Sequence, residues 1–153
     1  MTSDDSADMP DLLALENQVC FALAVASRRV IGLYRPLLEP MELTHPQYLV
    51  MLALWQHEPL TVKEVAEKLS LDSATLSPLL KRLESIGYLT RTRDPHDERA
   101  LRLELTPEGR ALRERATAIP PAIIDRLGMT IPELQDFHRR LTDVIARTAE
   151  SES

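Results

Sequence analysis

The sequence predicts a mainly helical fold with one small β-hairpin, and three patterns support this prediction. Apolar residues recur at helical spacing over long stretches, beginning with residues 11–38. Helix-capping residues, either Thr or Asp before a helix-forming run, recur further along the chain. Two short alternating segments, 88–93 and 100–105, flank the charged turn DPHDER. The 153 residues suffice for one domain, and because only 4% are aromatic its core should be aliphatic.

Two helices are predicted before residue 60. The first spans residues 11–38 and ends in the region that contains Pro36 and Pro40, because proline cannot donate a helical hydrogen bond. The second runs from residue 45 to about residue 57 with Thr44 as its N-cap, and the dipeptide Glu-Pro after it breaks the helix.

A helix-turn-helix is predicted next. Thr61 caps a short helix, and Glu64, three residues further on, completes a capping box. Asp72 then caps a second helix over residues 73–86, which carries leucines on one side and polar residues on the other. The hairpin at 88–105 follows directly, and in this position it forms the wing of a winged helix-turn-helix lobe.

Polar side chains on the helix 73–86 and on the wing suit DNA. Small hydroxyl residues near the start of a recognition helix allow close approach to the major groove, and basic residues can neutralise phosphates. Arginines at a wing tip suit a narrow minor groove, and Asp97 can hold the turn by bonding its backbone or Arg99. The alternative is a solvated helix beside an ordinary surface hairpin. The candidate DNA-binding residues are Ser73, Thr75, Ser77, Lys81, Arg82, Arg93, Asp97 and Arg99.

Two further helices complete the prediction. One follows Thr106 to about residue 127 with a bend at Pro120-Pro121, and the other spans residues 130–149. Long apolar helices at both ends of a chain must bury their faces, and a two-fold partner is the commonest solution. Two lobes related in this way would read a near-palindromic operator in double-stranded DNA. We therefore expect a disordered tail at 1–10 and one domain at 11–150, with dimerisation helices at 11–40 and 106–150 and a DNA-binding lobe at 44–105.

Charge and composition exclude several classes of protein. The net charge of −6 argues against an indiscriminate nucleic-acid binder, yet residues 81–102 hold six basic and four acidic side chains. No apolar run reaches the roughly 18 residues of a membrane helix, and the N-terminus lacks the order of a signal peptide. We therefore expect a cytoplasmic protein with no membrane contact. The histidines lack metal-ligand spacing, and neither a metal, a cofactor nor an enzymatic activity is expected.

Cys20 is the single cysteine of the chain, which excludes an intrachain disulfide. Taken alone, it is either a redox-active thiol or a small buried apolar residue. Tyr34 follows it by fourteen residues, within about 40° of the same helix face but about 21 Å along the axis. The two side chains can therefore meet only between chains, if the first helices of two subunits cross antiparallel near Ser27.

These features together resemble the MarR family of winged-helix regulators over nearly the whole chain. Asp97-Glu98-Arg99 matches the D-x-R wing signature of that family. The segments LENQVCFALAVASR, YRPLLEPMELTHPQYLVMLALWQHEPLTV and LDSATLSPLLKRLE resemble its OhrR subgroup of organic-hydroperoxide sensors, of the one-cysteine type. The resemblance implies a homodimeric repressor that releases operator DNA when an organic hydroperoxide oxidises its thiol. Cys20 occupies the place of the reactive cysteine of that subgroup.

The resemblance also implies a hydrogen-bonding network around the thiol. In the subgroup, tyrosines of the partner subunit bond the reactive cysteine; Tyr34 matches one of them, and the other two align with His45 and Ala24. His45 can still donate a hydrogen bond and is kept as a redox-site candidate, with a solvent-facing histidine as the alternative, whereas Ala24 cannot bond. Without a second cysteine, release of DNA would need a mixed disulfide with a low-molecular-weight thiol, or overoxidation.

Two other functions stay open at this point. A MarR-type repressor could respond to a non-covalent small phenolic or other ligand bound between its lobes. A thiol peroxidase could use Cys20, although no resolving cysteine or thioredoxin-type motif accompanies it. Phe21, Met51 and Trp55 either line an apolar pocket for a lipid-like peroxide or belong to the core.

Overall fold

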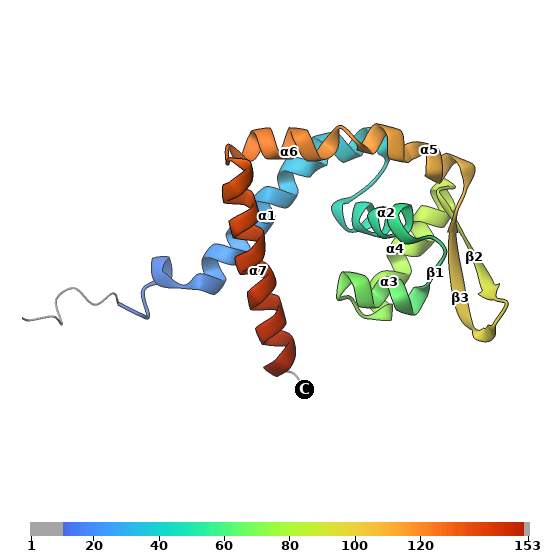
Figure 1. Ribbon diagram of the computed structural model, residues 1–153, viewed down its shortest axis with the longest axis horizontal. Helices are drawn as coiled ribbons and strands as arrows, with labels where there is room; N and C mark the ends of the chain where they lie inside the picture. Colours follow the sequence, from blue (N-terminus) through green and yellow to red (C-terminus); the bar gives the residue numbers. More distant parts are fainter. Residues whose placement is uncertain (1–10, 152–153) are drawn as a thin grey trace, which may run out of the picture. The chain divides into compact units, whose positions relative to one another are not determined.

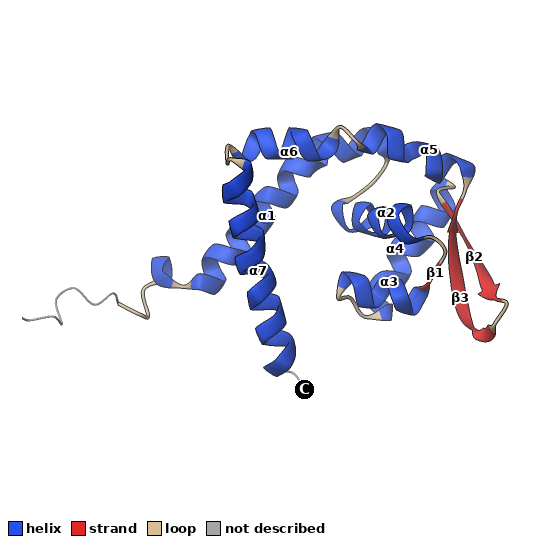
Figure 2. Ribbon diagram, viewed as in Figure 1, coloured by secondary structure: helices blue, strands red, loops and turns tan. Residues whose placement is uncertain are grey.

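The computed structural model describes residues 11–151 of the chain, with side chains as far as residue 149. Helices precede and follow a small β-sheet, as Figures 1 and 2 show, so the predicted mainly helical fold class is confirmed. The chain divides into two compact units with the boundary between Ala116 and Thr117. The tail predicted at residues 1–10 lies outside the described residues.

The first long helix is shorter than predicted. Residues 11–18 form a turn and the 3-10 helix η2 (Leu15–Asn17), and α1 (Val19–Leu38) follows. The side chain of Gln18 donates to two carbonyl oxygens of the preceding turn, at 2.5 and 3.1 Å, and such local bonds compete with the helical pattern. The helix ends at Leu38, which is the predicted last residue, but it continues through Pro36 rather than stopping before the prolines. A single proline removes one backbone bond, and the helix tolerates that loss here.

Both capped helices that follow have the predicted starts. In α2 (His45–His57), the N-cap Thr44 donates its backbone N–H to Oε1 of Gln47 at 2.9 Å. In α3 (Val62–Leu69), the Thr61 hydroxyl accepts the backbone N–H of Glu64 at 3.1 Å, which completes the predicted capping box.

The recognition helix α4 (Ser73–Ile86) has the predicted bounds. Asp72 caps it, and Gly87 ends it with a φ of +99°, a left-handed conformation that glycine adopts without strain. The core of the first unit is aliphatic, as the composition predicts, and α4 contributes its buried leucines to it. The largest fully buried side chains are Leu38, Val50, Met51, Leu54, Val65, Leu76, Leu80, Leu83, Leu89 and Leu103.

The wing has three strands rather than two. In addition to β2 (Leu89–Asp94) and β3 (Asp97–Leu105), the short strand β1 (Leu60–Thr61) pairs antiparallel with β3, which gives the order β1-β3-β2. A two-residue strand that leads directly into a helix cap carries no alternating pattern, so the sequence could not reveal it. The pairing between β2 and β3 is interrupted near the turn, where residues 98–100 of β3 have no partner on β2.

The wing, α2 and α5 (Pro107–Ala116) meet at Gly109. The indole N–H of Trp55 on α2 donates to the Gly109 carbonyl at 2.9 Å, and the Gly109 N–H donates to the Thr106 hydroxyl at 3.0 Å. A Cβ atom at this position would collide with the carbonyl oxygen of Tyr88. Only glycine therefore allows α5 to lie this close to the base of β2.

The turn between α1 and α2 is held from two sides. This turn contains the 3-10 helix η3 (Glu39–Met41). The Tyr88 hydroxyl donates to the Met41 carbonyl at 2.8 Å, and the Arg115 guanidinium donates to the Pro40 carbonyl at 3.2 Å. The turn is thus bonded both to the end of the recognition helix and to α5.

The second unit contains α6 (Ile119–Leu127) and α7 (Ile131–Ser151). The predicted single bent helix after Thr106 is instead two helices, because Pro120-Pro121 lie in the first turn of α6 rather than at a bend. Proline suits a first turn because its missing N–H has no helical partner there. Within the part of the chain that the structure describes, no helix is long and apolar enough to cross a membrane.

Replacement of Gly109 tests the close approach of α5. We expect Gly109→Ala to lower the free energy of unfolding by about 1–3 kcal/mol, because the added methyl group must push backbone against backbone. Urea denaturation measures the change. Glu108→Ala, at the exposed neighbouring position, should change it by no more than about 0.5 kcal/mol, and equal effects of the two variants would contradict the packing described.

Candidate DNA interface and thiol site

The recognition helix presents most of its predicted DNA-binding residues to solvent. Ser73, Thr75, Lys81 and Arg82 are exposed on α4, whereas Ser77 is half-buried rather than facing out as predicted. The leucines of α4 occupy the opposite side of the helix and pack into the core. The exposed side is therefore free to approach another molecule.

Asp72 fixes the start of this surface. Its Oδ1 accepts the backbone N–H of Thr75 at 2.7 Å. This bond, together with a bond from the Thr75 hydroxyl, holds the pKa of the Asp72 carboxyl below its usual range. The first turn of α4 is thus ordered before any ligand binds, and the Thr75 hydroxyl already has one protein partner.

The basic side chains of residues 81–102 fall into two groups. Arg91 pairs with Glu84 at 2.6 Å, which links β2 to α4, and Arg102 pairs with Glu104 at 2.9 Å within β3. The others make no ion pair with any residue that the structure describes: Lys81, Arg82, Arg93 and Arg99. The unpaired cations are the four that the sequence predicted for DNA.

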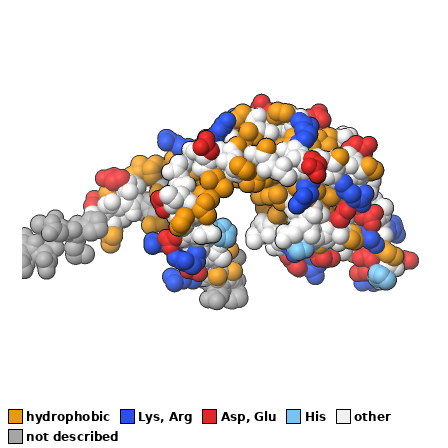
Figure 3. Space-filling view, turned by 45° about the horizontal axis from the view of Figure 1, so that its top comes forward, with side chains coloured by type: hydrophobic (Ala, Val, Ile, Leu, Met, Phe, Trp, Pro, Cys, Tyr) orange, Lys and Arg blue, Asp and Glu red, His pale blue; other side chains and the backbone are white. Residues whose placement is uncertain are grey.

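Charges of both signs are interspersed on the face that Figure 3 shows. Figure 3 shows Lys and Arg side chains beside Asp and Glu side chains, without a broad basic face in that view. Together with the net charge of −6, this favours binding to DNA through particular side chains rather than through uniform positive charge.

Two aspartates shape the wing turn. Asp94 Oδ1 accepts the backbone N–H of His96 at 2.8 Å, and Asp97 Oδ1 accepts the backbone N–H of Arg99 at 3.0 Å. The second bond is the backbone contact that the sequence predicted for Asp97. The sequence prediction missed the hydrogen bond that Asp94 accepts, although Asp side chains often accept the backbone N–H of the residue two positions later in a turn.

Cys20 is exposed in the first turn of α1. Leu38, at the far end, is the single fully buried residue of this twenty-residue helix. Cys20 and Tyr34 lie on the same continuous α1, about 21 Å apart along its axis, so Tyr34 cannot contact the thiol of its own chain.

Tyr34 instead belongs to an aromatic cluster with His45 and Tyr48. The ring centroids of Tyr34 and His45 are 4.8 Å apart in an edge-to-face arrangement, and those of Tyr34 and Tyr48 are 5.8 Å apart. The structure thus brings together two of the three predicted redox-site residues, Tyr34 and His45, but leaves Cys20 apart from them. Tyr48 was missed by the sequence prediction. Its position one helical turn after His45 is a signal that could have found it.

Burial sets the charge states in this aromatic cluster. It lowers the pKa of His45 and raises the pKa of Tyr34. The pKa of Tyr48 is raised by burial first and by the nearby Tyr34 second. All three side chains are therefore neutral near pH 7, and each retains a hydrogen that it can donate.

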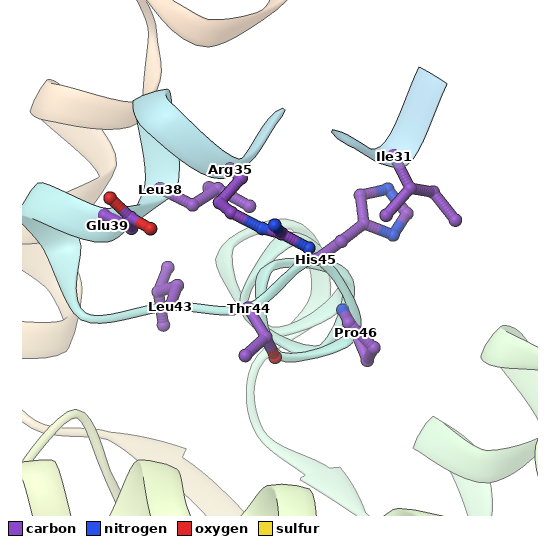
Figure 4. Close-up of a pocket in the computed structure, with 8 residues that line it drawn as sticks. All are labelled: Ile31, Arg35, Leu38, Glu39, Leu43, Thr44, His45 and Pro46. Carbon is purple, nitrogen blue, oxygen red and sulfur yellow. The ribbon is translucent and has the colours of Figure 1, made fainter. Parts of the chain in front are cut away.

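A pocket of 350 Å³ opens beside His45, between the end of α1 and the start of α2. Figure 4 shows the side chains of Arg35 and His45 reaching into this space, with Ile31 near the imidazole. Arg35 and Glu39 give the pocket one charge of each sign. It can hold a small molecule with an apolar body and a polar group.

The candidates for an apolar peroxide pocket do not cluster. Met51 is fully buried in the core, and Trp55 is committed to its bond with Gly109. Phe21 is 44% exposed on α1. Core packing therefore accounts for Met51, and only Phe21 shares a helix turn with the thiol.

Comparisons with known proteins agree with this geometry. The MarR family model matches residues 43–101, which run from just before α2 into β3. The organic hydroperoxide resistance transcriptional regulator of Bacillus subtilis is 49% identical over 114 residues, which cover 74% of this chain and 78% of that relative. The chain belongs to the MarR family. The resemblance inferred from the sequence motifs is thereby confirmed.

Other MarR-type relatives cover even more of the chain. TtmR of Methylorubrum extorquens, an HTH-type transcriptional regulator, is 45% identical over 89% of this chain and 68% of its own length. The structure of overoxidised AbfR of Staphylococcus epidermidis bound to DNA has a TM-score of 0.72 and 34% identity, over 88% of this chain and 94% of that chain. This protein is thus a DNA-binding transcription regulator of the MarR type.

Stability should depend on His45 at mildly acidic pH. Because burial lowers the pKa of His45, folding favours its neutral form. That contribution is complete above the unfolded pKa of about 6.5 and is lost as the pH falls through the lower folded value. We expect the wild type to lose stability relative to His45→Gln between about pH 7 and about pH 5. Urea denaturation across this range measures the difference, and parallel curves would contradict the burial of His45.

Proposed function

We propose that the protein is a homodimeric repressor that senses organic hydroperoxides through Cys20 and then releases operator DNA. The observation that carries the proposal is the position of its single thiol, which is exposed on a long helix that also exposes large apolar side chains, among them Phe21 and Leu23. Similarity to an organic hydroperoxide resistance regulator supports the choice of oxidant.

Uncovered apolar surface on the terminal helices supports the homodimer. Of the described side chains of α7, none is buried, and α1 buries one. Large apolar side chains exposed on two long helices favour a second copy of the same chain as the partner. We propose that residues 11–40 and 106–150 form the dimerisation helices around the DNA-binding lobe at 44–105. The large apolar residues exposed on α1 and α7 are Val19, Phe21, Leu23, Ile31, Ile131, Phe137, Val144 and Ile145.

Antiparallel crossing of two α1 helices would complete the thiol site. Cys20 and Tyr34 lie on the same side of α1 and equally far from Ser27, so a crossing there brings each thiol to Tyr34 of the partner subunit. His45 packs edge-to-face against Tyr34 within its own chain and would come with it. The neutral Tyr34 and His45 side chains can then donate hydrogen bonds to the thiolate.

The chemistry starts from the thiolate of Cys20. The sulfur attacks the terminal oxygen of the hydroperoxide ROOH, so an S–O bond forms while the O–O bond breaks. The leaving alkoxide takes a proton and becomes the alcohol ROH, and the sulfur, now a sulfenic acid, has lost two electrons. A low-molecular-weight thiol R′SH then condenses with it, forming an S–S bond and releasing water.

The sulfenic acid adds only one oxygen atom to Cys20, whereas the mixed disulfide adds a group large enough to displace neighbouring helices. A mixed disulfide at Cys20 would place this group between the two α1 helices of the dimer. Overoxidation would instead place a charged sulfinate or sulfonate at the same interface. AbfR, a relative whose solved forms include reduced, overoxidised and disulfide states, is consistent with a thiol that changes state in a regulator of this fold.

For DNA recognition, we propose that α4 enters the major groove and that the wing reaches the backbone or minor groove. Ser73 and Thr75 lie at the exposed start of α4, and Lys81 and Arg82 further along can contact phosphates. Arg93 and Arg99 serve as the wing cations, and Asp97 holds the Arg99 backbone. A dimer would bind a near-palindromic operator, and chromosomal DNA as partner implies a cytoplasmic site of action.

The pocket beside His45 favours one alternative. A small phenolic or acidic ligand could enter the 350 Å³ space, meet Arg35, and act without covalent chemistry. In that case Cys20 would be dispensable for release of DNA.

Replacement of the thiol separates these two proposals. We expect Cys20→Ser to bind operator as the wild type does but to keep it when cumene hydroperoxide and a small thiol are added, because serine has no oxidisable sulfur. Fluorescence anisotropy of labelled operator measures release, and mass spectrometry of the wild type identifies the adduct on Cys20. If Cys20→Ser also releases the operator on oxidation, the redox proposal fails. Release from both proteins by a phenol would favour the pocket.

Replacement of a wing cation tests the DNA-binding surface. We expect Arg93→Ala to weaken operator binding at least about tenfold at matched salt, because it removes an unpaired cation. Arg113→Ala, which removes an exposed arginine from α5, should bind normally. Sedimentation equilibrium should give twice the 17.3 kDa chain mass for both variants. Unchanged affinity of Arg93→Ala, or a monomeric wild type, would contradict the proposal.

A further inference from the structure

We infer that a cleft between α3, α4 and β3 binds a phosphate of the DNA backbone, and that Lys63 is a further DNA-positioning residue. The inference deepens the proposed function, because it rests on α4 as the helix that enters the groove. Lys63 was not among the residues that the sequence predicted for DNA.

The cleft has a volume of 240 Å³ and collects charge of one sign. Lys63 on α3 and Arg99 on β3 line it, together with the hydroxyl residues Thr61 and Ser73, and no carboxylate is among its lining residues. Neither Lys63 nor Arg99 makes an ion pair with any part of the chain between residues 11 and 149. Two unpaired cations with nearby hydroxyl groups suit a single oxyanion.

An irregularity in the hairpin brings Arg99 to this cleft. Arg93 pairs with Leu101 and the next residue, Asp94, pairs with Asp97, so residues 98–100 bulge from β3. A bulge redirects the side chains that it contains, and the bond from the Arg99 N–H to Asp97 holds this one in place. Arg93, which lies outside the bulge, does not line the cleft.

A neighbouring hollow of 200 Å³ provides a contrast within the same molecule. It shares Thr61 with the first cleft but is lined by Glu64, Asp94, His96 and Arg102. Its two carboxylates would repel a phosphate. At the start of α3, the positive charge of Lys63 thus lines the first cleft, and the negative charge of the capping residue Glu64 lines the neighbouring hollow.

The phosphate of a duplex is the occupant that fits this position. Ser73 is the first residue of α4, so the cleft adjoins the end of the recognition helix that enters a major groove. The DNA strand that borders this groove would run past the N-terminal end of α4. Lys63 contributes a point charge and Arg99 a planar pair of donors, both of which contact phosphate oxygens without reading a base.

The salt dependence of binding tests the inference. The probes are a duplex that the wild type selects from a random-sequence pool and a scrambled duplex of the same length. We expect Lys63→Gln to weaken binding to both by the same factor, and to reduce the slope of log K against log salt by about 1 per subunit. Lys63→Arg should bind as the wild type does. Lys68→Gln removes the same charge from the same helix outside the cleft, and it should keep the wild-type slope.

Uncharged phosphate analogues in the DNA backbone test whether Lys63 contacts a particular phosphate. Methylphosphonate placed at one backbone position per half-site should weaken wild-type binding but have no further effect on Lys63→Gln, because the two changes remove the same contact. Wild-type slope and affinity in Lys63→Gln would overturn the inference while leaving the DNA-binding proposal intact. A loss confined to the selected duplex would also overturn it, because that result indicates a base contact. If the wild type selects no duplex, the DNA-binding proposal and the inference both fail.

Discussion

Burial of three leucines of α4, Leu76, Leu80 and Leu83, is the interaction on which the DNA-binding surface depends. Each such side chain contributes roughly 1.5–3 kcal/mol when it leaves water, whereas an exposed ion pair contributes at most about 1 kcal/mol. The orientation of α4 is therefore set by apolar packing against the core. The ion pair between Glu84 and Arg91 refines its relation to the wing. Because the leucines hold one side of the helix, the opposite side can carry polar residues chosen for a ligand.

The thiol end of the protein has the opposite organisation. In the DNA-binding lobe, each chain buries its own apolar side chains, but among the described side chains of α1 and α7 only Leu38 is fully buried. Cys20 lies on such a helix, far from the aromatic cluster of Tyr34, His45 and Tyr48 on the same chain. Redox sensing in this protein is thus proposed as a property of the dimer, since a single chain cannot surround its own sulfur.

The sequence predicted those elements that local signals determine. Capping residues and leucine spacing gave α4 its correct bounds, and the same signals located the start of α7. The bulge at residues 98–100 and the strand β1 depend on pairing between distant segments, which no local pattern reports. The spacing of Tyr48 from His45 is a local signal, but the contact of Tyr48 with Tyr34 depends on the approach of α2 to α1. The proposed sites lie partly in these non-local features, so the sequence could name candidates such as Tyr34 and His45 but could not give their arrangement.

The two bonds to the turn between α1 and α2 have a mechanical consequence. Tyr88, at the base of the wing, donates a hydrogen bond to the Met41 carbonyl. Arg115, on α5, donates one to the adjacent Pro40 carbonyl. A rotation of α1 that displaces this turn must either pull the end of the recognition helix with it or rupture the Tyr88 bond. The Tyr88 hydrogen bond thus couples α1, which carries Cys20, to α4, the helix that is proposed to lie in the major groove.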